Sequence, residues 1–87
     1  MKLLLTGSSG FIGKQFTYYN RERFDIINLS NLDNLDNNIF KGINTIVHLA
    51  GLTNISSQTS FESFLESNLE ITKNLALTAK EAKVKQF

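Results

Sequence analysis

The chain has 87 residues with one histidine and no cysteine; 41% of the residues are hydrophobic, 20% are charged, and the formal net charge is +1. This length allows one small domain, and the near-neutral charge gives no electrostatic basis for binding nucleic acid or an anionic membrane. The lack of cysteine excludes a disulfide framework and a thiolate metal site, and it agrees with an expected cytoplasmic location. No apolar run approaches the roughly 20 residues that a membrane-spanning helix needs.

The first half of the chain alternates apolar runs with polar segments. Residues 2–6 (KLLLT) form a continuous apolar run that predicts a strand buried on both faces. Apolar residues recur at helical spacing over 11–20, and the polar segment 20–23 predicts a turn. Residues 24–29 (FDIINL) predict a second strand. The Asn- and Asp-rich residues 30–38 predict a loop that contains a short strand or turn.

The second half repeats this order. Residues 42–51 (GINTIVHLAG) predict another buried strand, followed by a loop over 52–60. A long helix is predicted over 61–83, and Thr59 with Glu62 predicts a capping box at its start. Strands that alternate with helices indicate a parallel α/β sheet with right-handed crossovers.

The C-terminal residues 84–87 (VKQF) look like the approach to another strand. We therefore expect residues 1–87 to be the incomplete N-terminal half of a larger α/β fold. The face of the 61–83 helix and the edge of the 42–51 strand would then lack their usual cover. Exposed strand edges and apolar patches favour association, so self-association is expected.

Three glycines, Gly7, Gly10 and Gly13, stand three residues apart between the first strand and the first helix. Gly7 permits a tight turn, Gly10 lets the backbone approach a pyrophosphate, and Gly13 allows close packing of helix on strand. The unpaired N–H groups of the helix N-terminus attract phosphate, and Ser8 and Ser9 offer hydroxyl donors. A flexible turn needs only one or two glycines, so the spacing favours a dinucleotide site.

A Walker A phosphate loop is the competing interpretation of this segment. Gly13 and Lys14 imitate its Gly-Lys pair, but Ser8 stands where the motif has its first glycine. Gln15 follows the lysine in place of the Ser or Thr that holds Mg²⁺. The dinucleotide interpretation is therefore favoured.

Three segments extend this pattern along essentially the whole chain: KLLLTGSSGFIG (residues 2–13), INTIVHLAG (43–51) and FLESNLEITKNLALTAKEAKVKQF (64–87). Together they closely resemble the NAD-dependent epimerase/dehydratase family of the extended short-chain dehydrogenase/reductase superfamily. The resemblance implies a Rossmann-like parallel sheet with flanking helices, and NAD or NADP as the cofactor. It also implies a nucleotide-sugar substrate, which only a full-length form would bind.

The resemblance also implies which residues contact the cofactor. The loop 6–13 would hold the pyrophosphate, the residues after the second strand would meet the adenosine, and those that end the 42–51 strand would line the adenosine-side and ribose wall. In the family, the residue matching Asn68 ties its helix to a neighbouring strand rather than taking part in chemistry. The implied cofactor-binding residues are Gly7, Ser8, Ser9, Gly10, Phe11, Ile12, Gly13, Ser30, Asn31, Asp33, Leu49, Ala50 and Gly51.

Two departures from the family pattern bear on function. Members that prefer NAD commonly carry an Asp at the end of the second strand, where this chain has Ser30, so NAD and NADP both stay open. The family's catalytic Ser/Thr and Tyr-x-x-x-Lys pair would come after Phe87, and neither Tyr18 nor Tyr19 has a lysine four residues on. The 87 residues alone are therefore expected not to transfer a hydride.

His48, the single histidine, lies within a predicted strand without metal-binding partners, so a packed or hydrogen-bonded core residue is expected. Two classes of function stay open: the dinucleotide-binding portion of a nucleotide-sugar epimerase, dehydratase or reductase, and a non-catalytic module that senses a dinucleotide or binds a partner. A degenerate, truncated remnant is a third interpretation, which the missing Asp at Ser30 favours.

Overall fold

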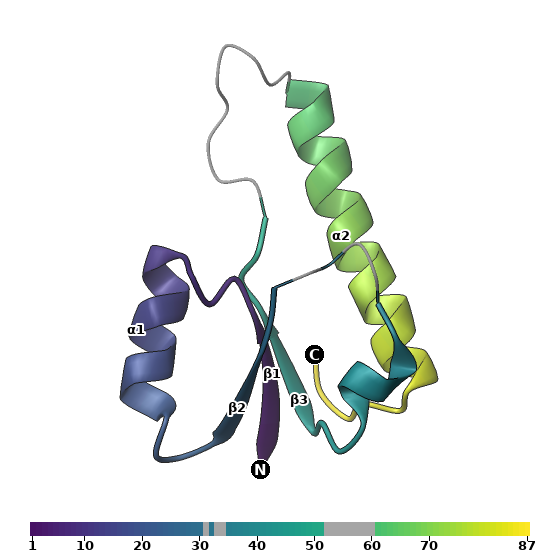
Figure 1. Cartoon of the computed structure of the whole chain (residues 1–87). Helices are drawn as coiled ribbons and strands as arrows, with labels where there is room; N and C mark the ends of the chain where they lie inside the picture. The colour runs from purple at the N-terminus through teal and green to yellow at the C-terminus, as the bar shows by residue number, and fades with distance from the viewer. Residues whose placement is uncertain (31, 33–34, 52–60) are drawn as a thin grey trace.

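The structure is a computed structural model that describes residues 1–30, 32, 35–51 and 61–87. It contains a three-stranded parallel sheet with helices on both sides, which confirms the predicted α/β, Rossmann-like fold (Figure 1). No helix in this described part of the chain is long and apolar enough to span a membrane. The elements, in chain order, are β1 (Lys2–Thr6), α1 (Phe11–Asn20), β2 (Asp25–Leu29), the 3₁₀-helix η1 (Asn37–Phe40), β3 (Thr45–His48) and α2 (Phe61–Glu81).

The sheet has the strand order β2-β1-β3, and both pairs are parallel. β1 is the central strand, and Leu3, Leu4 and Leu5 are all buried because both faces of the strand are covered. Helix α1 lies on one side of the sheet, while η1 and α2 lie on the other (Figure 1). Right-handed crossovers that leave β1 and β3 toward opposite edges of a sheet produce this arrangement.

The main core lies between the sheet and α2. Leu4 and Ile46 contribute from the strands, while Leu75 and Ala79, which are four residues apart on one helix face, contribute from α2. Phe40 completes this core from η1 and is only 2% exposed. The apolar periodicity of the long helix is therefore explained by packing on the sheet.

The predicted loop 30–38 contains no strand among its described residues, but the single 3₁₀ turn η1 begins within it, which agrees with the turn expected there. The carboxylate of Asp36 accepts a hydrogen bond from the backbone N–H of Asn38 at 2.9 Å, and this contact caps the turn. The cap directs the chain so that Phe40 enters the core beside α2.

The predicted strand over 42–51 is shorter in the structure, because only Thr45–His48 form β3. Gly42 adopts a left-handed φ of 79° ahead of the strand. At the other end, Leu49 and the two residues after it leave the sheet and form part of the loop above its carboxyl edge.

The C-terminal segment 84–87 approaches the free edge of β3, as expected. Gln86 forms a parallel bridge with Thr45. The backbone N–H of Ile46 donates to the carbonyl of Gln86 at 2.9 Å, and the N–H of Gln86 donates to the carbonyl of Asn44 at 3.2 Å. The sheet therefore begins to extend beyond β3.

Helix α2 ends at Glu81, two residues before the predicted end, because Lys83 adopts a left-handed φ of 63°. The N–H of Lys83 donates to the carbonyl of Lys80 at 3.1 Å, and the N–H of Val84 donates to the carbonyl of Ala79 at 3.0 Å. This pair of hydrogen bonds is a Schellman motif, in which the left-handed residue is usually glycine. Because a lysine occupies this position, the sequence carried no signal for the helix end.

The left-handed conformation of Lys83 costs a residue with a side chain about 1–2 kcal/mol. Glycine avoids this cost but loses more conformational entropy on folding. Lys83→Gly is therefore expected to stabilise the chain by about 0.5–1 kcal/mol. Urea denaturation followed by circular dichroism measures the change. Lys85→Gly is the control, since Lys85 has no positive φ and should gain nothing. A Lys83→Gly variant no more stable than the original chain would contradict the prediction.

Candidate functional site

A cavity of about 330 Å³ lies at the carboxyl end of β1 and β3. Parallel α/β sheets bind ligands at this edge, where the loops that follow neighbouring strands come together. The lining comes from the β1–α1 loop, the first turn of α1 and the residue after β3, namely Gly7, Gly10, Phe11, Ile12, Gly13 and Leu49.

Two of the three glycines are required by the packing of the chain itself. Gly7 has a φ of +76°, and a Cβ there would lie 2.7 Å from the backbone nitrogen of Ala50 and from the carbonyl carbon of Leu49. A Cβ on Gly13 would lie 2.0 Å from the carbonyl oxygen of Gly7. The predicted role of Gly7 in a tight turn is therefore confirmed, whereas Gly13 brings α1 against the glycine loop and not, as predicted, against the strand.

Gly10 differs, because the described chain does not require glycine at this position. Its φ of −75° and ψ of 170° suit any residue. A Cβ there would meet only the carbonyl oxygen of Gly7, at an ordinary 3.5 Å. Gly10 is also the N-cap residue of α1, and no side chain caps the helix. The first turn of α1 therefore presents backbone N–H groups and the positive end of the helix dipole to the cavity.

The other predicted residues that the structure describes lie at the same edge but do not line the cavity. Ser8 is half-buried and Ser9 is exposed in the turn after β1. Ser30 is exposed directly after β2, and Ala50 and Gly51 continue the chain from Leu49. Asn31 and Asp33, like Thr59 of the predicted capping box, lie outside the described residues.

Helix α2 also reaches this edge. A Cβ on Gly51 would lie 3.0 Å from Oδ1 of Asn68, so the amide of Asn68 packs against the loop after β3. This agrees with the expected role of Asn68 as a contact between the helix and a neighbouring strand.

A polar network that is buried at Thr6 and exposed at Thr72 joins β1, β3 and α2 beside the cavity. The hydroxyl of Thr6, a fully buried residue, lies 2.6 Å from Nδ1 of His48 and 3.1 and 3.2 Å from the backbone nitrogens of Leu49 and Ala50. Nε2 of His48 lies 3.1 Å from the hydroxyl of Thr72. His48 is hydrogen-bonded, as expected, although it is half-buried and lies outside the core. Partial burial lowers the pKa of its imidazole below the ordinary value. Sequence reasoning included Thr6 in the phosphate loop but missed its contact with His48, although the two are directly paired residues of β1 and β3.

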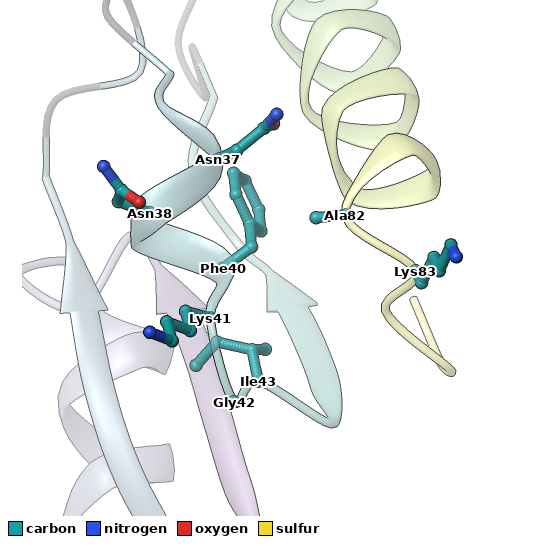
Figure 2. Close-up of a pocket in the computed structure, with 8 residues that line it drawn as sticks. All are labelled: Asn37, Asn38, Phe40, Lys41, Gly42, Ile43, Ala82 and Lys83. Atoms are coloured by element: carbon teal, nitrogen blue, oxygen red, sulfur yellow. The ribbon is translucent and has the colours of Figure 1, made fainter.

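A larger cavity, of about 410 Å³, lies between η1 and the end of α2 (Figure 2). Gly42 and Ile43 line it, so it lies at the amino end of β3, away from the glycine loop. The side chains of Lys41 and Lys83 extend in opposite directions (Figure 2). Because its charged groups do not converge, this cavity is not favoured as a functional site.

Comparison with known proteins places the chain in a family. The model of the NAD dependent epimerase/dehydratase family matches residues 3–87. No curated protein sequence matches the chain. Among solved structures, MoeE5 in complex with UDP-glucose and NAD is 26% identical, with a TM-score of 0.78, over 97% of this chain and 34% of that one. Uronate dehydrogenase from Agrobacterium tumefaciens is 27% identical, with a TM-score of 0.58, over 92% of this chain and 36% of that one.

A third structure supports the fold alone. UDP-glucuronic acid 4-epimerase from Bacillus cereus in complex with NAD is 18% identical, with a TM-score of 0.81, over 99% of this chain and 37% of that one. The chain thus spans about a third of the length of these structures. Because the family model covers nearly every residue, the chain belongs to the NAD-dependent epimerase/dehydratase family.

Proposed function

We propose that residues 1–87 form the dinucleotide-binding portion of an oxidoreductase that acts on a nucleotide sugar, with NAD or NADP as its cofactor. The observation that carries this proposal is Gly10, whose lack of a side chain serves no described contact within the chain and keeps the cavity open to the first turn of α1. Family membership and the NAD in the MoeE5 complex support it. The bound dinucleotide would supply the acceptor and donor of a hydride.

The pyrophosphate would lie against the first turn of α1, where the backbone N–H groups have no partner inside the helix. Ser8 and Ser9 would add hydroxyl donors from the turn after β1. Phe11 and Ile12 line the cavity, and their 81% and 66% exposure leaves apolar surface for the cofactor to cover. Leu49, with Ala50 and Gly51, would form the wall on the ribose side.

The preference between NAD and NADP would depend on the residues after β2. Ser30 offers a hydroxyl where a carboxylate would select the free ribose hydroxyls, and no arginine stands beside it in the sequence to hold a 2′-phosphate. We therefore propose weak discrimination between the two cofactors, with Asn31 and Asp33 on the adenosine side.

The residues that transfer a hydride would lie outside 1–87. Neither Tyr18 nor Tyr19 precedes a lysine at the spacing the family uses, and both belong to α1 rather than to the carboxyl edge of the sheet. The UDP-glucose in the MoeE5 complex supports a nucleotide sugar as the substrate of the whole protein.

Self-association also remains a proposal. Phe61, Leu65 and Leu69 are 62%, 56% and 62% exposed, and they follow one another at four-residue spacing along α2. Such an apolar stripe favours burial against a second copy. The cytoplasmic location and the lack of a nucleic-acid partner, expected from composition, likewise stay predictions.

Replacing Gly10 with alanine tests the proposed function. We expect the chain to fold as before, because the added Cβ meets only one backbone oxygen at an ordinary distance. The methyl group would nevertheless stand between the pyrophosphate and α1, and the affinity for NAD⁺ should fall about tenfold or more, which corresponds to at least about 1.4 kcal/mol. Isothermal titration with NAD⁺ and NADP⁺ measures the loss.

Gly42→Ala is the matched control. Gly42 has a φ of 79°, so alanine is strained there, but the residue lies at the opposite edge of the sheet. This variant should lose stability and keep its affinity for NAD⁺. A Gly10→Ala variant that binds as tightly as the original chain would contradict the proposed pyrophosphate position.

A further inference from the structure

The hydrogen-bond partners of Thr6 fix the direction of its hydroxyl proton. Two of the three partners are the backbone N–H groups of Leu49 and Ala50, which can only donate. The third is Nδ1 of His48, at 2.6 Å. Since a hydroxyl donates one hydrogen bond and accepts two, a hydroxyl that accepts both N–H groups has its proton left for Nδ1, and we assign it there. The N–H of Leu49 is shared with the backbone carbonyl of Thr6 at 3.2 Å, so the N–H of Ala50 is the less divided of the two donors.

The direction of that proton fixes the tautomer of His48. An Nδ1 that accepts a hydrogen bond is unprotonated, so the neutral imidazole carries its proton on Nε2. Nε2 lies 3.1 Å from the hydroxyl of Thr72, which accepts this proton. A continuous chain of donors therefore runs from the backbone after β3, through Thr6 and His48, to α2.

We propose that neutral His48 is a positioning residue that ties α2 to the Leu49–Ala50 wall of the dinucleotide cavity through Thr6, and that protonation of His48 releases this wall. The inference rests on the proposed function for its consequence, because Leu49 lines the cavity. Protonation would place a second hydrogen between Nδ1 and a hydroxyl that already receives two N–H groups. The hydroxyl must then give up the imidazole or an amide of the wall.

The surroundings of the ring favour its neutral form. β1 presents Thr6 to the ring, α2 presents Thr72, and the C-terminal segment places the ring of Phe87 at 6.2 Å between centroids. None of these side chains ionises. Lys73, which follows Thr72 on α2, and Lys85, two residues before Phe87, are both exposed. Burial lowers the pKa of His48, so the network is complete above the ordinary pKa and is lost as the pH falls through the lowered one.

The first test observes the imidazole directly. Because the chain has one histidine, its two ring nitrogens give unambiguous ¹⁵N signals. We expect a bare Nδ1 and a protonated Nε2 at neutral pH, and we expect the amide of Ala50, which bonds the Thr6 hydroxyl, to lose protection from hydrogen exchange as His48 protonates. The amide of Leu49 also bonds the backbone carbonyl of Thr6 and is the internal reference. A proton on Nδ1 of the neutral ring, or unchanged protection of the Ala50 amide, would overturn the inference.

The second test measures NAD⁺ affinity one pH unit above and one below the midpoint found by NMR, with circular dichroism confirming the fold at both. The expected loss below the midpoint is on the order of tenfold. In His48→Asn, Oδ1 can still accept from Thr6 but cannot ionise, so this variant should bind equally at both pH values. Equal affinity of the original chain at both, or the same pH dependence in His48→Asn, would overturn the inference. If NAD⁺ fails to bind above the midpoint, the proposed function is wrong. The tautomer of His48 and the amide protection still test, independently, whether His48 ties α2 to the loop after β3.

Discussion

Replacing Gly13 with alanine is expected to destabilise the chain by on the order of 3 kcal/mol, the upper end of overpacking costs. The new Cβ would lie 2.0 Å from the carbonyl oxygen of Gly7 and 2.8 Å from Cα of Ser8, and neither backbone atom can rotate away. Helix α1 would have to move off the loop, and the cavity lined by Gly13 and Ile12 would change shape. The stability of a small domain is only about 5–15 kcal/mol, so this loss is a large share of it.

The direction of this change separates packing from helix propensity. Alanine is favoured over glycine inside a helix by about 1 kcal/mol, so propensity alone predicts stabilisation. Gln15→Ala, at an exposed position of α1, is the control and should be neutral within about 0.5 kcal/mol. Urea denaturation of the three chains measures the difference. A Gly13→Ala variant at least as stable as the original would contradict the close approach of α1 to the loop.

Thr6→Val has the second large expected effect. Valine fills the same volume but removes the hydroxyl, which leaves the amide of Ala50 and Nδ1 of His48 without this partner. A buried polar group without a partner costs about 1–3 kcal/mol, and because both hydrogen bonds are only partly buried, the expected loss for the two groups together is about 1–3 kcal/mol. Leu49 keeps its hydrogen bond to the backbone carbonyl of Thr6, so only part of the wall is released.

Thr6→Ser is the matched variant, because it keeps the hydroxyl and removes one methyl group, at an expected cost of about 0.8 kcal/mol. Urea denaturation gives the stabilities, and titration with NAD⁺ gives the affinities. Serine should preserve binding and the tautomer of His48, whereas valine should weaken binding. Equal losses in the two variants would show that the methyl group, not the hydroxyl, holds the loop after β3.

The sequence predicted those parts of the fold that depend on local patterns. The apolar run of β1, the helix over Phe11–Asn20 and the glycine spacing all lie within single segments, and each was placed correctly. The Thr6–His48 contact joins residues 42 positions apart and depends on the register of β1 with β3. A parallel register follows from the packing of the whole sheet. The sequence therefore indicated that His48 would be packed or hydrogen-bonded, but not which residues would be its partners.

Two other differences have local causes that ordinary sequence signals do not mark. Phe40 reaches the core because Asp36 caps a short turn within a segment whose composition is that of a loop. Lys83 ends α2 in a conformation that usually calls for glycine. In both places the energy of the packed core, to which Phe40, Ala79 and Val84 contribute, outweighs the intrinsic preference of the local sequence.

The unequal demands on the three glycines have a consequence for how such a sequence changes over evolutionary time. Folding alone preserves Gly7 and Gly13, since a side chain at either one collides with the backbone. A descendant that had stopped binding any dinucleotide would therefore keep both, and its motif would still look two-thirds intact. Position 10 is under no such constraint, because mutation there is sterically permitted. Among related sequences, a substitution at position 10 is thus the change in this motif that would mark the loss of dinucleotide binding.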